Sequence, residues 1–118
     1  MIKYSLNKNF RLLTSRQYKF VLKNSYKVQF NEIIILGRVN NFNYPRLGIS
    51  ISKQNVRNSV ERNYIKRLVR EFFRVHKNNL LLMDYVVIVK KKIFRYKNRI
   101  FLNKLKYLWS RYFFNLKN

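Results

Sequence analysis

The rest of the chain is organised around the segment SKQNVRNSVERNYIKRLVREFFR, residues 52–74. At about 100° per residue its side chains separate into two halves of one helix. The apolar half consists of Val60, Tyr64, Ile65, Leu68, Val69 and Phe72. The polar half consists of Arg62, Asn63, Lys66, Arg67, Arg70 and Arg74, with Glu71 at its margin. We therefore predict an amphipathic helix from about Val56 to Val75, with Asn55 or Ser59 as its N-cap.

The polar half of this helix carries charge of almost one sign. A helix face that only contacts water usually mixes acidic and basic side chains. Cations crowded on one rigid rod repel each other, and a partner rich in phosphate relieves that repulsion. A solvated charged face is the simpler alternative, but the bias towards arginine and lysine favours binding to a polyanion.

The composition of the chain points to the same class of partner. Its 118 residues carry a net charge of +23 and only four acids, namely Glu32, Glu61, Glu71 and Asp84. Cysteine is absent, which excludes disulfides and thiolate zinc sites. The single histidine, His76, follows the predicted helix and is interpreted as a helix-end residue. We predict neither catalytic residues nor a metal site on this chain.

No apolar run is long enough to span a bilayer, and the first residues lack the apolar core of a secretory signal. We therefore expect a cytoplasmic protein. Basic amphipathic helices also bind anionic lipid surfaces. In a chain of this size, however, the apolar half of the helix is needed for the core, which disfavours a role at a membrane.

The rest of the chain predicts a small mixed architecture. The expected elements are a helix from Thr14 or Ser15 to about Lys23, strands within 26–52 and 81–90, and a last helix over roughly 96–116. The apolar stripe of the last helix comprises Leu105, Leu108, Trp109, Tyr112 and Leu116. A turn at 40–45 predicts that the strands before and after it form an antiparallel pair. We predict one α/β (α+β) domain over residues 1–118, a sandwich of helices on a sheet in the order α-β-β-β-α-β-α.

Five segments carry a resemblance to a known family. They are Arg62-Asn63 with Lys66-Arg67-Leu68 and Arg70-Glu71, the preceding Lys53-Gln54-Asn55-Val56-Arg57, the strands Arg46–Ile51 and Asp84–Lys90, and the first helix region Phe10–Leu22. In this order and spacing they resemble the bacterial ribonuclease P protein component over nearly the whole chain. One residue departs from the family pattern, because Tyr64 stands where the family usually has the second arginine of its motif.

The resemblance implies both a fold and a role. The fold is a four-stranded mixed sheet with a left-handed βαβ crossover, like domain 2 of ribosomal protein S5. The role is the RNA-binding protein subunit of ribonuclease P, which helps a catalytic RNA to remove the 5′ leader of precursor tRNA. The implied partners are that RNA and the leader, without a membrane or a small-molecule cofactor. Mg²⁺ is expected mainly on the RNA and not on the protein alone.

The resemblance also implies two groups of site residues. The residues expected to bind RNA are Arg57, Arg62, Asn63, Lys66, Arg67, Arg70 and Arg74. The residues expected to line a cleft for the leader are Tyr18, Lys19, Leu22, Lys53 and Lys90. An aromatic ring beside an ammonium group suits this task, because the ring stacks on a base and the ammonium contacts phosphate. The alternative is another basic RNA-binding protein, such as a ribosomal protein with no processing role, which composition alone does not separate.

Overall fold

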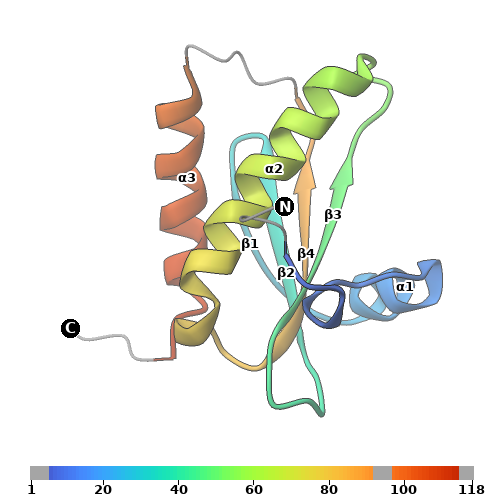
Figure 1. Ribbon diagram of the computed structural model, residues 1–118, viewed down its shortest axis with the longest axis vertical. Helices are drawn as coiled ribbons and strands as arrows, with labels where there is room; N and C mark the ends of the chain where they lie inside the picture. The colour runs from blue at the N-terminus through green and yellow to red at the C-terminus, as the bar shows by residue number, and fades with distance from the viewer. Residues whose placement is uncertain (1–5, 92–96, 115–118) are drawn as a thin grey trace.

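The computed structural model describes residues 6–91 and 97–114 (Figure 1). Its elements are η1 (Lys8–Phe10), α1 (Ser15–Lys23), β1 (Tyr26–Phe30), β2 (Ile33–Val39), β3 (Arg46–Ile51), α2 (Ser59–His76), η2 (Lys77–Asn79), β4 (Met83–Val89) and α3 (Asn98–Ser110). Apart from the two short 3₁₀ turns, this is the predicted order of helices and strands. The predicted ends of the last helix, Tyr96 and Leu116, lie outside the described residues.

The four strands form one mixed sheet in the order β1-β2-β4-β3. Strand β4 is antiparallel to β2 and parallel to β3. The predicted pairing of β2 with β3 is wrong, because β4 lies between them. The two most continuously apolar strands, β2 and β4, take the central positions, where both faces are covered. Strand β3 alternates apolar and small residues and lies at an edge.

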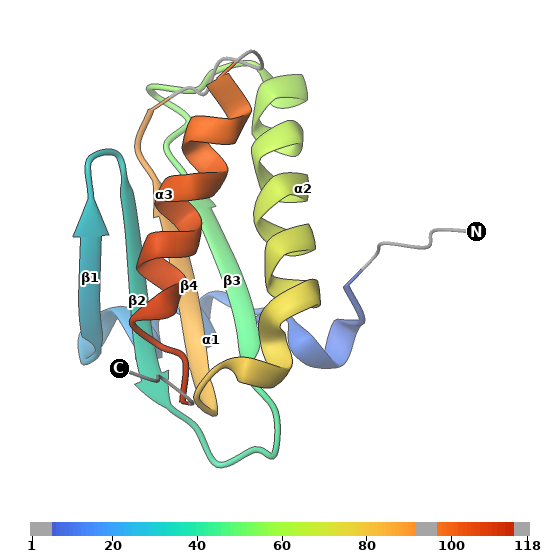
Figure 2. The same ribbon diagram turned by 90° about the vertical axis from the view of Figure 1, so that its left-hand side faces the viewer.

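The connection from β3 through α2 to β4 is left-handed. Figure 2 shows α2 in front of the sheet, with β3 and β4 running upward and β4 on the left of β3. A right-handed crossover, which nearly all parallel pairs adopt, places the second strand on the right. The crossover that the family resemblance implied is therefore confirmed.

The helices cover the two faces of the sheet unequally. Helices α2 and α3 lie side by side on one face (Figure 2) and enclose the main core around Phe73, Tyr85 and Trp109. Helix α1 covers part of the other face, where Val21 packs with Val86 in a smaller cluster. Thr14 caps α1 in a capping box with Gln17.

Helix α2 differs from the prediction in two details. Its N-cap is Asn58, whose side chain accepts a hydrogen bond from the Val60 N–H, so neither Asn55 nor Ser59 has this role. Its buried residues are Ile65, Val69 and Phe73. The apolar face is thus rotated away from Val60, which is 60% exposed near the free end of the helix.

Within residues 6–91 and 97–114, no helix has the length and apolar character needed to cross a bilayer.

Candidate nucleic-acid interface

The polar residues of α2 and of the loop before it differ in how far they are exposed to solvent. Asn63 and Arg67 are exposed, as is Arg57 in the loop before the helix. The side chains of Arg62, Lys66, Arg70 and Arg74 are half-buried, because they flank the apolar face that packs on the sheet. The helix therefore offers some cations to a partner directly and holds others along its margins.

Arg62 is bound to the backbone of its own chain. Its Nη1 atom donates hydrogen bonds of 2.8 Å to the carbonyl oxygens of both Val56 and Arg57. A guanidinium has five N–H donors, so this leaves others available for a partner. Val56 is buried in the main core. Because Arg62 binds the backbone of both Val56 and Arg57, it holds the loop that leads into α2 against this core.

The remaining cations of this face differ in their partners. Arg74 forms an ion pair with Glu71, with 2.6 Å between Nη2 and Oε2. Among the described residues, no acidic side chain pairs with Lys66, Arg67 or Arg70. Three cations within little more than one turn of the helix thus keep their charge available for a partner.

A pocket of about 190 Å³ lies between α2 and the segment that precedes α1. Its polar lining comes from Arg11, Tyr18, Lys66 and Arg70. Burial lowers the pKa of Arg70, and the nearby charge of Arg11 lowers it further. The Nε atom of Arg11 is buried without a hydrogen-bond partner. The positive charges of Arg11 and Arg70 are close together and partly excluded from solvent. Such a site favours the binding of an anion.

Arg11 is the residue of this pocket that the sequence analysis missed. It forms an isolated parallel bridge with Leu47, and the Leu12 N–H donates to the Leu47 carbonyl oxygen at 2.8 Å. The segment thereby covers the free edge of β3. In the sequence, Arg11 is only a basic residue beside an apolar one, before a capped helix. This pattern is too common to identify Arg11 as a binding residue.

Tyr18 is positioned by β3. Its hydroxyl accepts a hydrogen bond from the Ile49 N–H at 3.1 Å. Its ring lies so close to the backbone that a Cβ atom on Gly48 would meet the ring at 2.7 Å. Gly48 is therefore required for this close approach. Tyr18 is half-buried, and it brings one predicted leader residue into the same pocket as two predicted RNA-binding residues, Lys66 and Arg70.

The other predicted cleft residues lie around an open part of the sheet. Lys19 is exposed on α1, and Leu22 is 51% exposed one turn after Tyr18. Lys53 and Lys90 are exposed just beyond the ends of the parallel strands β3 and β4. Backbone and side-chain hydrogen bonds, from Ser52 to Val89 and from Asn55 to Lys90, tie these two strand ends together.

Between α1 and these two lysines, the sheet presents a row of small and apolar side chains. Ser50 pairs with Ile88, which pairs in turn with Ile34. Ser50 is exposed and Ile88 is half-buried. The side chains at these sheet positions, between α1 and the two ammonium groups, are thus uncharged.

Tyr64, the departure from the family motif, faces another helix. Its hydroxyl accepts a hydrogen bond from the Asn98 side chain at 3.1 Å, in the first turn of α3. The side chain is half-buried. In this chain, position 64 therefore joins α2 to α3.

Three of the acids and the histidine each contact another side chain. Glu32, Glu71 and Asp84 each contact a cation, namely Lys104, Arg74 and Arg46 in that order. His76 stacks on Phe72, with ring centroids 4.1 Å apart, at the end of α2. In the part of the chain that the structure describes, no cluster of three metal-binding side chains occurs.

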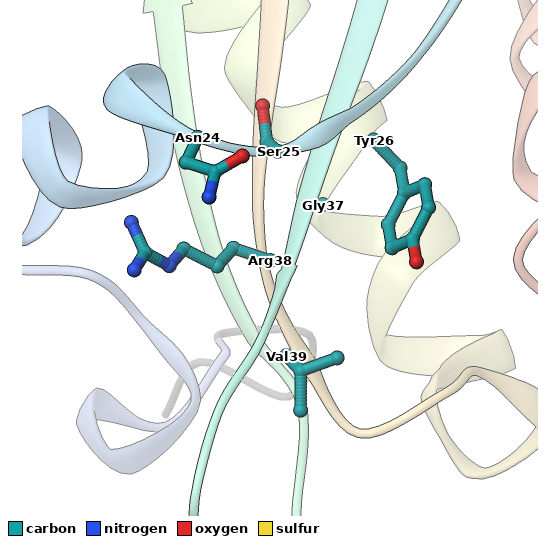
Figure 3. A pocket seen from close by; sticks show the side chains of 6 residues that line it. All are labelled: Asn24, Ser25, Tyr26, Gly37, Arg38 and Val39. Carbon is teal, nitrogen blue, oxygen red and sulfur yellow. The ribbon is translucent and has the colours of Figure 1, made fainter.

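A second pocket, of about 380 Å³, lies on the other side of α1 and contains none of the predicted site residues. Figure 3 shows Arg38 extending from β2 towards α1 near Asn24, whereas Tyr26 points to the opposite side. The Arg38 guanidinium lies 3.5 Å from the centroid of the Phe20 ring and donates to the Phe20 carbonyl oxygen at 2.8 Å. Its charge is engaged in holding the end of α1.

Comparison with known proteins identifies the family. The family model described as Ribonuclease P matches residues 6–113. The ribonuclease P protein component of Buchnera aphidicola subsp. Schizaphis graminum is 43% identical over 112 residues, which cover 95% of this chain and 98% of that protein. The same component of Escherichia coli O157:H7 is 41% identical over 112 residues, which cover 95% and 94% of the two chains.

Solved structures agree with this result. The RNase P protein from Staphylococcus aureus matches with a TM-score of 0.72 and 29% identity, over 97% of this chain and 99% of that one. The RNase P protein from Thermotoga maritima matches with a TM-score of 0.69 and 27% identity, over 92% and 98% of the two chains. The comparisons give no support to the alternative of a ribosomal protein.

The ordered motifs, the left-handed crossover and the unpaired cations of α2 agree with these matches. The chain belongs to the ribonuclease P protein family, and its role is that of the protein component, with an RNA partner, in an endoribonuclease that processes tRNA.

Proposed function

We propose that the cationic face of α2 binds the catalytic RNA of ribonuclease P and that the cleft beside α1 holds the 5′ leader of precursor tRNA. Arg57, Arg62, Asn63, Lys66, Arg67, Arg70 and Arg74 form the first surface, and Tyr18, Lys19, Leu22, Lys53 and Lys90 form the second. The whole chain, residues 1–118, acts as one ribonuclease P protein domain in the cytoplasm, where bacterial tRNA precursors are made.

The observation that carries this proposal is the pocket shared by Tyr18, Arg11, Lys66 and Arg70. It joins the end of the leader cleft to the cationic face of α2. The leader and the catalytic RNA are both polyanions, so they repel each other when they are brought together. Cations between them lower that repulsion. One compact protein with a net charge of +23 can therefore contact both RNAs at adjoining surfaces.

In this proposal the protein contributes binding and the RNA contributes the chemistry. Hydrolysis of a phosphodiester needs a base, a nucleophile or a metal cage, and the acids Glu32, Glu71 and Asp84 are already bound to cations. Mg²⁺ is held mainly by the RNA and not by the protein alone. The cations of the protein act on it indirectly, by reducing the repulsion between the two RNAs.

The leader cleft is tested by Tyr18→Ala in the complex reconstituted with ribonuclease P RNA. Loss of one base–aromatic stack is expected to weaken the affinity for precursor tRNA by about 1–3 kcal/mol. The affinity for mature tRNA, which lacks a leader, is expected to stay nearly unchanged. The measurement is the pair of dissociation constants for wild type and variant.

Tyr18→Phe is the matched control, because it keeps the ring and removes only the hydroxyl that accepts from Ile49. We expect it to retain most of the affinity for precursor tRNA. An equal loss for precursor and mature tRNA in Tyr18→Ala would make Tyr18 a structural residue and would refute the proposed cleft.

A further inference from the structure

A third pocket, of about 410 Å³, lies at the end of the sheet where β3 and β4 begin. It is formed by η1, the loop between β2 and β3, the segment from η2 to β4, and the turn after α3. Figure 2 shows the β2–β3 loop and the end of α2 together at this end of the molecule. Helix α2, with 18 residues, separates it by roughly 27 Å from the end that carries Lys53 and Lys90. None of the residues proposed above lines this pocket.

The pocket presents aromatic rings that are held in place. The Phe10 ring meets the Tyr44 ring edge-to-face, with centroids 5.2 Å apart. Phe114 is 59% exposed, although its N–H is fixed by a hydrogen bond of 3.0 Å to the Asn79 carbonyl oxygen. An exposed ring on an anchored backbone is a ready surface for stacking, because little freedom is lost when a flat ligand binds.

The polar groups of this pocket favour an anionic partner. Among the residues that the structure describes, Lys77 is the one charged residue in its lining, with Nζ 5.0 Å from the Phe10 centroid. Asn43 and Asn78 are exposed there, and no hydrogen bond engages their side chains. Within residues 6–91 and 97–114, no carboxylate lines the pocket. An apolar segment of a protein offers no negative charge to the ammonium, whereas a nucleotide offers its phosphate to Lys77 and the edge of its base to both amides.

We propose that this pocket binds one unpaired nucleotide of the ribonuclease P RNA. The base stacks on the exposed ring of Phe114, the amides of Asn43 and Asn78 bind its edge, and the Lys77 ammonium contacts its phosphate. The choice of this RNA rests on the proposed function, because the pocket lies at the carboxyl end of the helix whose cationic face is assigned to it. The protein thereby contacts the RNA both along the cationic face of α2 and at the carboxyl end of this helix.

The pocket is tested first with a small probe that does not depend on the proposed function. Adenosine 5′-monophosphate is titrated into the full-length, ¹⁵N-labelled protein, and amide shifts are followed at Asn43, Asn78 and Phe114. We expect shifts at these amides, and at least a fivefold weaker dissociation constant in Phe114→Ala. Tyr107→Ala, which removes a ring of similar exposure from α3, is the matched control and is expected to bind as the wild type does.

The second arm measures affinity for ribonuclease P RNA with the same variants. Phe114→Ala is expected to weaken it about 5- to 140-fold, and Phe114→Tyr to restore it, because the ring is what stacks. Indole, which has no phosphate, is the contrasting probe. If indole binds the pocket as tightly as the nucleotide does, or the shifts map elsewhere, the proposal is overturned. A wild-type protein that fails to bind this RNA refutes the proposed function instead, whatever the small-probe result.

Discussion

At the scale of single residues, two arginines of α2 show that a shared motif does not mean a shared environment. Arg62 donates to the carbonyl oxygens of Val56 and Arg57. Arg67 is exposed and pairs with no described acid. The first therefore acts on the fold as well as on a partner, and the second acts on a partner alone.

This difference predicts separate effects on stability. Arg62→Ala removes hydrogen bonds from a charged donor, and we expect it to lower the free energy of unfolding by about 1–2 kcal/mol. Arg67→Ala is expected to stay within about 0.5 kcal/mol of the wild type. Urea unfolding of the free protein measures both. Equal stability of the two variants would show that the loop contacts of Arg62 contribute nothing.

At the scale of elements, the cationic face of α2 is expected to behave as a set of phosphate contacts. Lys66→Ala and Arg70→Ala should each weaken binding to ribonuclease P RNA by about 1–3 kcal/mol, and should make the salt dependence shallower by about one unit. Lys106→Ala, which removes an exposed cation from α3, is the control. A salt dependence that stays the same in all three variants would contradict the assignment of this face.

The elements also show what sequence reasoning can and cannot reach. The amphipathic period of α2 and the start of α1 at Ser15 depend on local sequence, so both could be predicted. The pairing of β2 with β4 could not, because strand neighbours depend on contacts distant in sequence. The cap at Asn58 was missed for a smaller reason: several side chains before the helix are suitable, and the packing of Ile65, Val69 and Phe73 selects among them.

In the candidate site, too, local features could be predicted and contacts between distant segments could not. Its α2 cations are visible in the sequence because they share one helix face. The contribution of Arg11 to the pocket with Arg70 is not visible, since it requires the edge of β3 to bring the two together. Nor does the sequence reveal the contact of Tyr64 with Asn98, which lies 34 residues away.

At the scale of the whole molecule, an aromatic core supports a surface of very high positive charge. The Trp109 ring meets the Tyr85 ring edge-to-face at 4.9 Å, and Tyr85 meets Tyr112 at 5.0 Å. The Tyr85 hydroxyl donates to the Leu81 carbonyl oxygen at 2.7 Å, and the Tyr112 hydroxyl donates to the Ile35 carbonyl oxygen at 2.9 Å. Dense packing of this kind holds the fold together although the surface charges repel one another.

Burial raises the pKa of both Tyr85 and Tyr112 well above the usual value of a tyrosine. The unfolded chain loses these protons near pH 10, whereas the folded chain keeps them. Their contribution to stability is therefore fully present below about pH 10 and is lost as the pH rises towards the higher folded pKa, by about 1.4 kcal/mol per pH unit for each tyrosine.

Tyr112→Phe removes one of the two groups and should roughly halve this alkaline loss. The measurement is the free energy of unfolding at pH 8 and pH 11 for wild type and variant. Comparing the two proteins cancels the titration of the lysines, which they share. A loss of the same size in both would show that the Tyr112 hydroxyl ionises equally in the folded and unfolded chain.

The central claim is that this protein supplies binding and its RNA partner supplies catalysis. The most direct measurement is the rate of precursor tRNA cleavage at low Mg²⁺ by ribonuclease P RNA alone, by the protein alone and by the two together. We expect little cleavage by the RNA alone, none by the protein, and rapid removal of the 5′ leader by the mixture. Cleavage by protein that has been rigorously freed of RNA, or no acceleration of the RNA by the protein, would contradict it.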